Sequence, residues 1–235
     1  VQSSHVIVGQ PRMLDFEYMR WIAAVLDSHI QTHLNPEKLR ITHLGGGACS
    51  LARYCADVYP NSRNTVVELD AKLAEYVRDW FDIPKSPRVK IRVGDAGTVT
   101  RSFAPASRDV VIRDVFAVDK TPAELTGVDF VRTVDHSLAP GGLYILNCGD
   151  DRTLNAARAE AAALLEVFEY VSIVADSAML KGRRRGNIIL AGSHAPLPQL
   201  GSVEAASISR VLMGGGVPAQ YWDTEKVRVF ARKGA

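Results

Sequence analysis

The first apolar pattern along the chain is helical. Between residues 14 and 30, apolar side chains recur at intervals of three and four, which predicts an amphipathic helix with one buried stripe. The stripe consists of Leu14, Tyr18, Trp21, Ile22, Val25 and Leu26. The Asn35-Pro36 pair then predicts a turn over residues 35–40.

After this turn, short runs rich in Val, Ile and Leu alternate with segments of helical spacing. Strands are predicted over residues 41–44, 64–69, 89–93, 109–113 and 143–147. Helices are predicted over residues 48–59, 71–81, 97–103 and 128–138, with Asp70 and Asp129 as N-terminal caps. Strands of almost continuous apolar character are typical of a sheet that is covered on both faces. Because strands and helices alternate, we expect βαβ units and a parallel sheet.

The second half of the chain changes this pattern. An alanine-rich helix is predicted over residues 153–168, and two further strands over 170–175 and 187–191. The segment between these two strands is short and rich in charge and glycine, so we expect a hairpin rather than a crossover. The predicted fold class is therefore α/β, with a doubly wound, mostly parallel sheet of seven strands and an antiparallel hairpin at its edge.

Three parts are predicted along the chain. Residues 1–34 form an N-terminal segment with a helix, residues 35–194 form the main α/β domain, and residues 195–235 form a C-terminal appendage. Within the appendage, the pattern predicts a short helix around 203–213 and one last strand over 227–230.

Composition excludes several classes of protein. The chain has 235 residues, of which 47% are apolar and 23% are charged, as is typical of a soluble globular protein. A net charge of +2 gives no general attraction to nucleic acid or to anionic membranes, so we expect neither partner. No apolar run approaches the ~20 residues that span a bilayer. Three cysteines without CxxC spacing favour a reducing cytoplasm.

Neither the histidines nor the cysteines suggest a metal site. His29 and His33 lie four residues apart, on one face of the first predicted helix, but the glutamate of an HExxH motif is missing. We therefore expect a solvated pair of histidines and no metal. Cys49 has no histidine near it in the sequence, so we interpret it as a small helix residue rather than a nucleophile.

Glycine or a carboxylate follows each of four consecutive predicted strands. These residues are Gly45–Gly47, Glu68, Asp95 and Asp114. Ligands of an open parallel sheet bind at the carboxyl ends of its strands, so the four strand ends predict a ligand crevice. Glycines let a backbone approach a ligand closely, and a carboxylate after the second strand suits the two hydroxyls of a ribose. Asp95 could accept the amino group of adenine. We therefore expect an adenosine-containing ligand.

Other nucleotide motifs fit less well. The segment "GGGACS" meets GxGxxG only in part, because Ser50 stands where the last glycine belongs, so a dinucleotide is disfavoured. No GK[ST] follows the glycines, as a phosphate-binding loop would require.

Taken in order, the motifs "HLGGGACSLARY", "VVELD", "RVGDA" and "VIRDVF" resemble those of the spermidine synthase family. This family is a branch of the S-adenosylmethionine-dependent methyltransferase fold, which is Rossmann-like, and the similarity runs from about residue 2 to residue 193. The segment "LDFEYMRW" is similar to the DEFxYxE segment of the same family. The resemblance implies an enzyme that moves an aminopropyl group from decarboxylated S-adenosylmethionine to putrescine and needs no metal.

The resemblance also implies roles for individual residues. Gly45–Gly47 would cradle the amino-acid-derived end of the adenosyl ligand, and Glu68 would hold the ribose hydroxyls. Asp95 and Ala96 would bind adenine. Asp114 matches the first aspartate of the DSSDP motif, which helps to bind the amine and accepts its proton.

Two N-terminal positions and the assembly complete these expectations. Tyr18 matches the tyrosine of DEFxYxE, near the same amine, and Gln2 matches a glutamine close to the substrate. Members of the family usually form dimers or tetramers, so the resemblance implies a homodimer.

The chain departs from the family at the amine side of the site. Ala48 stands where the motif GGGDG has its aspartate, Ala117 replaces the second aspartate of DSSDP, and Asp119 comes two positions late. Met19 and Arg20 follow the tyrosine in place of polar and acidic residues, so a positive charge is expected there. Two alternatives therefore stay open: a methyltransferase that uses intact S-adenosylmethionine on an unknown acceptor, and an inactive relative that still binds the nucleoside.

Overall fold

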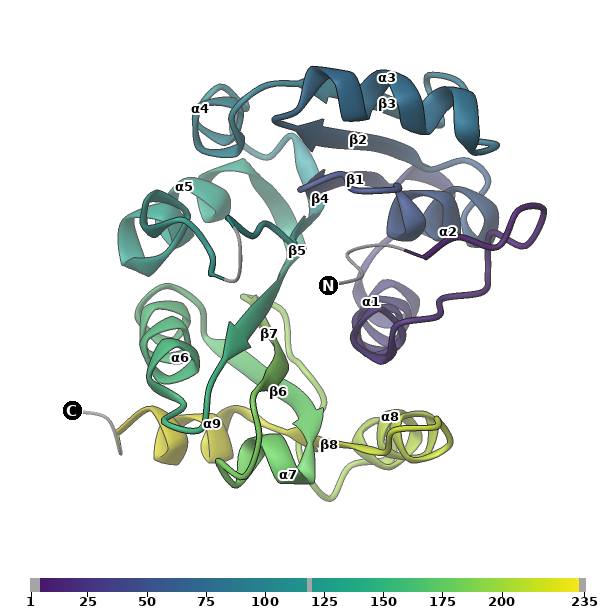
Figure 1. Cartoon of the computed structure of the whole chain (residues 1–235). Helices are drawn as coiled ribbons and strands as arrows, with labels where there is room; N and C mark the ends of the chain where they lie inside the picture. The colour runs from purple at the N-terminus through teal and green to yellow at the C-terminus, as the bar shows by residue number, and fades with distance from the viewer. Residues whose placement is uncertain (1–4, 118–119, 233–235) are drawn as a thin grey trace.

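The computed structural model describes residues 5–117 and 120–232, so Gln2 and Asp119 lie outside the described residues. Its elements follow the predicted alternation of strands and helices (Figure 1). In chain order they are α1 (Glu17–His33), the 3-10 helix η1 (Pro36–Lys38), β1 (Arg40–Leu44), α2 (Ser50–Val58), β2 (Arg63–Glu68), α3 (Ala71–Trp80), β3 (Val89–Val93), α4 (Ala96–Arg101), β4 (Arg108–Arg113), the 3-10 helix η2 (Ala123–Leu125), α5 (Gly127–Ser137), β5 (Leu138–Asp150), α6 (Asn155–Val167), β6 (Tyr170–Asp176), α7 (Ser177–Leu180), β7 (Gly186–Ser193), α8 (Val203–Met213), β8 (Ala219–Trp222) and α9 (Thr224–Arg232).

The strands form one sheet in the order β3-β2-β1-β4-β5-β7-β6-β8. The first five strands of this order are parallel, whereas β7 runs antiparallel to both β5 and β6. The predicted fold class, a doubly wound and mostly parallel α/β sheet with an antiparallel hairpin, is therefore confirmed. The predicted number of seven strands is wrong, because the described residues contain an eighth, β8, which pairs antiparallel with β6.

The error lies in the C-terminal segment. Residues 227–230 were expected to form a strand, but they belong to α9. Val227 and Phe230, which are three positions apart, are both buried, and this is helical rather than strand spacing. The added strand β8 has only four residues, too few for its alternation to be recognised. Residues 195–235 thus contribute to the sheet, and the boundaries at 34 and 194 remain predictions.

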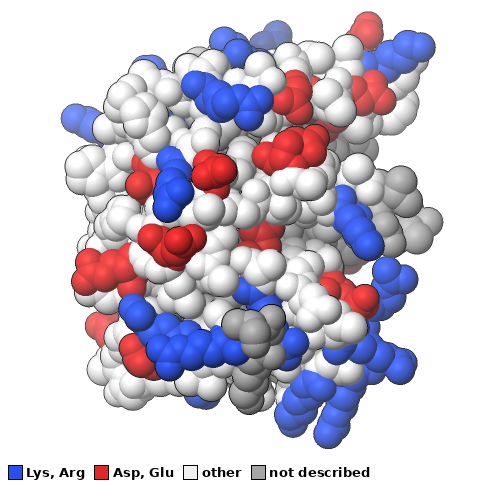
Figure 2. All heavy atoms as spheres, turned by 90° about the vertical axis from the view of Figure 1, so that its left-hand side faces the viewer, with Lys and Arg blue, Asp and Glu red and all other residues white. Residues whose placement is uncertain are grey.

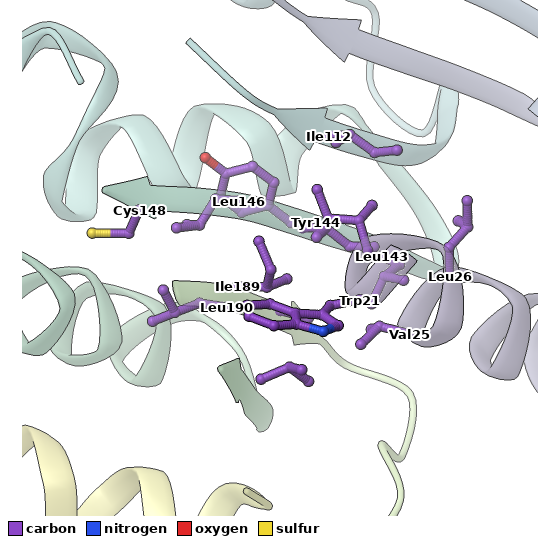
Figure 3. Close-up of a cluster of buried hydrophobic side chains, with 14 of the residues drawn as sticks. Trp21, Val25, Leu26, Ile112, Leu143, Tyr144, Leu146, Cys148, Ile189 and Leu190 are labelled. Atoms are coloured by element: carbon purple, nitrogen blue, oxygen red, sulfur yellow. The ribbon is translucent and has the colours of Figure 1, made fainter. Parts of the chain in front are cut away.

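Helices cover both faces of the sheet. In Figure 1, α1, α2 and α8 lie on one side of the sheet, and α4, α5 and α6 on the other. The predicted amphipathic helix is α1, and its stripe packs on β5 and β7, where Trp21 and Leu26 meet Leu143 and Ile189 (Figure 3). Each large apolar side chain that is fully buried in this way contributes about 1.5–3 kcal/mol. This packing fixes α1 beside the carboxyl ends of β4 and β5.

Within the described residues, no helix is both long enough and apolar enough to span a bilayer. The prediction of a solvated histidine pair is wrong for His29, which is 2% exposed. Its Nε2 lies 2.8 Å from the carbonyl oxygen of Gly141. His29 therefore ties α1 to the start of β5, and burial lowers its pKa to about 4, so the ring is neutral at pH 7.

Candidate functional site

A pocket of about 490 Å³ lies at the carboxyl ends of β1, β2, β3 and β4. Gln2 lies outside the described residues, and the lining contains all the other residues that the sequence predicted for the site, namely Tyr18, Gly45, Gly46, Gly47, Glu68, Asp95, Ala96 and Asp114. Strands β1 and β4 are neighbours in the sheet although two strands separate them in the chain. This is the switch point at which doubly wound sheets bind ligands. The fold thus brings the predicted residues together, while their individual roles remain predictions.

The glycine turn after β1 is shaped by the protein's own chain. Gly45 has φ +90°, and a Cβ atom on it would lie 2.2 Å from the backbone oxygen of Asp114. A Cβ atom on Gly46 would lie 2.9 Å from Oε2 of Glu68. The sequence suggested that these glycines make room for a ligand. The backbone at the end of β4 occupies the space beside Gly45, and the side chain of Glu68 occupies the space beside Gly46.

We expect Gly45→Ala to destabilise the fold by at least about 3 kcal/mol, because it combines a strained backbone with a clash against backbone atoms. Gly201→Ala is the matched control: Gly201 has φ +95°, but a Cβ atom there would meet nothing within 4 Å. The control should lose only the ~1–2 kcal/mol of left-handed strain. Urea unfolding of both variants measures the difference, and equal losses would contradict the close approach.

Glu68 stabilises the glycine turn. Its Oε2 accepts the backbone N–H groups of Gly46 and Gly47 at 3.0 and 3.1 Å, and its Oε1 accepts the N–H of Asp70 at 2.9 Å. A carboxylate offers about four acceptor positions, so one remains for a ligand hydroxyl. The sequence predicted that Glu68 would hold a ribose, and the structure adds that the same side chain orders the loop.

Asp95 caps the helix that borders the pocket. Its Oδ1 accepts the N–H of Thr98 at 2.7 Å, at the N-terminus of α4. This bond holds the pKa of the exposed Asp95 carboxyl below its usual value. Ala96, the first residue of α4, is buried next to it. Asp95 therefore presents an ionised carboxylate at the edge of the pocket.

Asp114 lies between two hydrogen-bond donors from other elements. The hydroxyl of Tyr18, on α1, donates to Oδ2 at 3.0 Å, and Nδ2 of Asn147, on β5, donates to Oδ1 at 2.9 Å. The parallel register of β4 and β5 explains the contact between Asp114 and Asn147. Arg113 lies opposite Leu146, so the next residue of each chain segment lies beside the other.

Asn147 was missed by the sequence reasoning. It is 1% exposed and lies among the apolar residues of β5. One signal was available: Asn147 is the polar residue at the carboxyl end of the fifth predicted strand, and the other four strand ends had each supplied a site residue.

The environment of Asp114 makes its carboxylate more basic than usual. Burial raises the pKa of Asp114, and the hydrogen bonds from Asn147 and Tyr18, with the charge of Arg113, oppose this rise in part. Burial and the nearby Asp114 also raise the pKa of Tyr18, so the phenol remains a neutral donor. A carboxylate with a raised pKa beside a pocket is suited to accept a proton from a ligand.

On the opposite face of β4, Arg113 is fully buried and pairs with Glu160 of α6 at 2.5 Å. It also donates to the carbonyl of Leu125, a residue that lines the pocket. Because side chains alternate along a strand, this ion pair fixes the strand end while Asp114 faces α1.

The pocket lining contains apolar residues at positions where the resemblance implies polar or acidic residues that bind an amine. Met19 and Ala48 line the pocket and are 7% and 6% exposed. The expectation that Arg20 brings a positive charge there is wrong. Its guanidinium donates to the carbonyls of Leu14 and Asp15, at 2.7 and 2.5 Å, and the residue is absent from the pocket lining.

The sequence raised two other kinds of candidate residue, a cysteine beside the glycines and possible metal ligands. The prediction that Cys49 is a helix residue is wrong, because it directly precedes α2 with φ 58°. Burial raises the pKa of its thiol to about 12, which disfavours a nucleophile. Across the described ranges, no group of three or more His, Cys, Asp or Glu side chains could hold a metal ion.

The basic segment Lys181–Arg185 connects α7 to β7. Arg184 forms an ion pair with Asp176 at 2.5 Å, and Lys181, Arg183 and Arg185 are exposed. Figure 2 shows Lys and Arg side chains gathered along the lower part of one face, at the height of α7 and α9 in Figure 1. This agrees with a solvated tip for the hairpin that the sequence predicts between residues 170–175 and 187–191.

Comparisons with known proteins show which family the chain resembles. The chain is 60% identical to a probable spermidine synthase from Corynebacterium glutamicum ATCC 13032, whose crystal structure it matches with a TM-score of 0.95 over 97% of this chain and 82% of that chain. Human methyltransferase-like protein 13, solved in complex with SAH, is 26% identical with a TM-score of 0.66, over 84% of this chain and 90% of that chain.

Among curated proteins, the polyamine aminopropyltransferase of Vibrio vulnificus (strain CMCP6) is 26% identical over 149 residues, which are 63% of this chain and 48% of that protein. The chain spans less than a fifth of several other curated relatives. No family model matches. The identity and coverage shared with the Corynebacterium protein are nevertheless decisive, and the chain belongs to the spermidine synthase-like family.

Proposed function

We propose that this protein transfers an aminopropyl group from decarboxylated S-adenosylmethionine to an amine. The observation that carries the proposal is the position of Asp114, a basic carboxylate beside the glycine turn, held by Tyr18 and Asn147. An amine acceptor arrives protonated and cannot attack carbon until it loses a proton. Asp114 can attract the ammonium group and take that proton.

In the proposed reaction, the acceptor ammonium gives one proton to Asp114, and its nitrogen lone pair attacks the carbon beside the sulfonium. A C–N bond forms while the C–S bond breaks, and the bonding electrons go to sulfur. The products are a secondary ammonium and neutral methylthioadenosine. The sulfonium is itself a good leaving group, so positioning of the two substrates and one proton acceptor are sufficient.

The nucleoside half of the pocket supports an adenosyl donor. In this proposal, Glu68 accepts a ribose hydroxyl at its remaining acceptor position, and Asp95 accepts the adenine amino group. Ala96 offers its backbone N–H at the start of α4, and Gly45–Gly47 lie against the donor's sulfonium end. The homodimer that the resemblance implies remains a prediction.

A second candidate is a methyltransferase that uses intact S-adenosylmethionine. It is favoured by the apolar Ala48, which makes a carboxylate-bearing donor less unfavourable than an acid would, and by the similarity to a methyltransferase-like protein solved with SAH. Calorimetry separates the candidates. We expect decarboxylated S-adenosylmethionine to bind more tightly than S-adenosylmethionine, and the opposite order would favour methyl transfer. Binding of methylthioadenosine without turnover of any amine would indicate an inactive relative.

We expect Asn147→Ala to move the acid limb of the pH–rate profile upward by about one pH unit. The Asn147 hydrogen bond stabilises the ionised carboxylate, so its loss raises the pKa of Asp114 further, and activity is lost at a higher pH as the solution is acidified. A hydrogen bond to a charged group is worth about 1.5–3 kcal/mol, and one pKa unit corresponds to about 1.4 kcal/mol. Cys148→Ala, at the neighbouring position, is the control and should leave the acid limb in place. If the acid limb of the pH–rate profile stays in place in Asn147→Ala, Asn147 does not stabilise the ionised form of Asp114 during the reaction.

A further inference from the structure

We propose that the acceptor is an amine with a single positive charge and an apolar body, and that diamines are disfavoured. This inference rests on the proposed aminopropyl transfer and concerns the half of the pocket that holds the acceptor. It follows from the number of carboxylates there, from the residues around Asp114, and from the acceptor positions that Asp114 retains.

The carboxylates of the described pocket lining are unevenly distributed. They are Glu68, Asp70, Asp95, Asp114 and Glu124. Glu68 is bound to the glycine turn, and Asp70 caps α3 by accepting the N–H groups of Lys72 and Leu73.

Two further acids of the lining, Asp95 and Glu124, belong to the nucleoside side. Asp95 caps α4, and Glu124 belongs to η2, which packs against α4. Among the described lining residues, this leaves Asp114 as the carboxylate of the acceptor side, between α1 and β4.

Apart from the side chains that donate hydrogen bonds to Asp114, the described lining residues on this side are apolar. Met19 and Ala48 lie in the lining and are buried, and Val115 and Phe116 follow Asp114 in the chain and also line the pocket. Phe116 is 37% exposed and adds apolar surface near the opening. Arg20, the charged residue nearest in sequence to Met19, is bonded to backbone carbonyls outside the lining.

Asp114 itself can accommodate one ammonium group. Its two oxygens offer about four acceptor positions, and Tyr18 and Asn147 occupy one on each oxygen. The two that remain suit a single ammonium. Among the described lining residues, a second ammonium at the far end of a diamine would meet apolar side chains and no further carboxylate, and burying an unpaired charge is strongly unfavourable.

The test compares pentylamine with putrescine, because the two molecules have the same length and differ by a methyl group in place of the second ammonium. Release of methylthioadenosine from decarboxylated S-adenosylmethionine is measured with the full chain. We expect kcat/KM for pentylamine to be at least tenfold higher. Equal values, or a preference for putrescine, would overturn the inference and leave aminopropyl transfer intact. If methylthioadenosine is released at the same rate without any amine, both the acceptor inference and the proposed aminopropyl transfer are overturned.

Added carboxylates should reverse the preference. Ala117→Asp places an acid at an exposed position of the lining, where it does not disturb the core, and Ala48→Asp places one deeper. Each variant should raise the putrescine-to-pentylamine ratio of kcat/KM at least tenfold. Ala206→Asp, on the exposed side of α8, makes the same change in net charge far from the pocket and should leave the ratio unchanged. An unchanged ratio in Ala117→Asp would contradict the inference even if Ala48→Asp does not fold.

Discussion

Asp114→Asn is expected to lower kcat by at least about a hundredfold, the lower end of what a positioned proton acceptor contributes. The amide keeps the size of the side chain and can still bond to Tyr18 and Asn147, whose groups can donate or accept after reorientation. It can neither attract the ammonium as a charge nor take its proton. The measurement is amine-dependent release of methylthioadenosine, and a kcat near that of the unchanged protein would remove Asp114 from the reaction.

The stability of Asp114→Asn provides the control for folding. The folded-state pKa of Asp114 is raised, so its ionised form opposes folding, and this penalty is present above the raised pKa and disappears as the pH falls through it. At pH 7, the neutral amide should therefore unfold at the same temperature as the unchanged protein or at a higher one. A large loss of stability would mean that the drop in kcat reports misfolding rather than chemistry.

Glu68→Ala is expected to weaken methylthioadenosine binding by about a hundredfold or more. The substitution removes the proposed ribose acceptor and leaves the N–H groups of Gly46, Gly47 and Asp70 without their partner. A hydrogen bond to a charged group contributes up to about 3 kcal/mol, and every ~1.4 kcal/mol is tenfold in affinity. Calorimetric titration gives the change in Kd.

Glu68→Gln separates the two roles of this residue. In this variant, the amide oxygen can still accept the N–H groups of Gly46 and Gly47, so the turn should stay ordered. The NH2 group takes the place of Oε1, which accepts the N–H of Asp70 in the unchanged protein, and it can only donate. We expect affinity between those of the unchanged protein and Glu68→Ala. Unchanged affinity in Glu68→Ala would refute the ribose assignment.

Much of the fold could be predicted because apolar runs of the parallel strands are unambiguous. Strands β1, β4 and β5 are almost wholly buried in the middle of the sheet, so their Val-, Ile- and Leu-rich runs contrast with the helical spacing between them. The C-terminal strand β8 could not be predicted, because four residues at a sheet edge carry little pattern. Residues 227–230 were misassigned because a run as short as "VRVF" fits both helix and strand.

The site was predictable for a related reason. In a parallel sheet, the residues that follow each strand meet at one edge, so Gly45–Gly47, Glu68, Asp95 and Asp114 could be grouped without coordinates. The contact between Asn147 and Asp114 depends on the register of two strands that are far apart in the chain, which one sequence does not encode locally. The orientation of Arg20 depends on the path of the backbone at residues 14 and 15, whose carbonyls it binds, and a spacing pattern does not give this path. The same holds for Gly45. A side chain there would clash with the backbone of Asp114, which follows a strand three strands further along the chain.

Incubation with decarboxylated S-adenosylmethionine and an amine, followed by mass spectrometry of both products, tests the central claim most directly. Aminopropyl transfer predicts one methylthioadenosine for each amine that gains an aminopropyl group, with the yield lost in Asp114→Asn. A methylated acceptor formed from S-adenosylmethionine, or the absence of any amine-dependent methylthioadenosine, would contradict it.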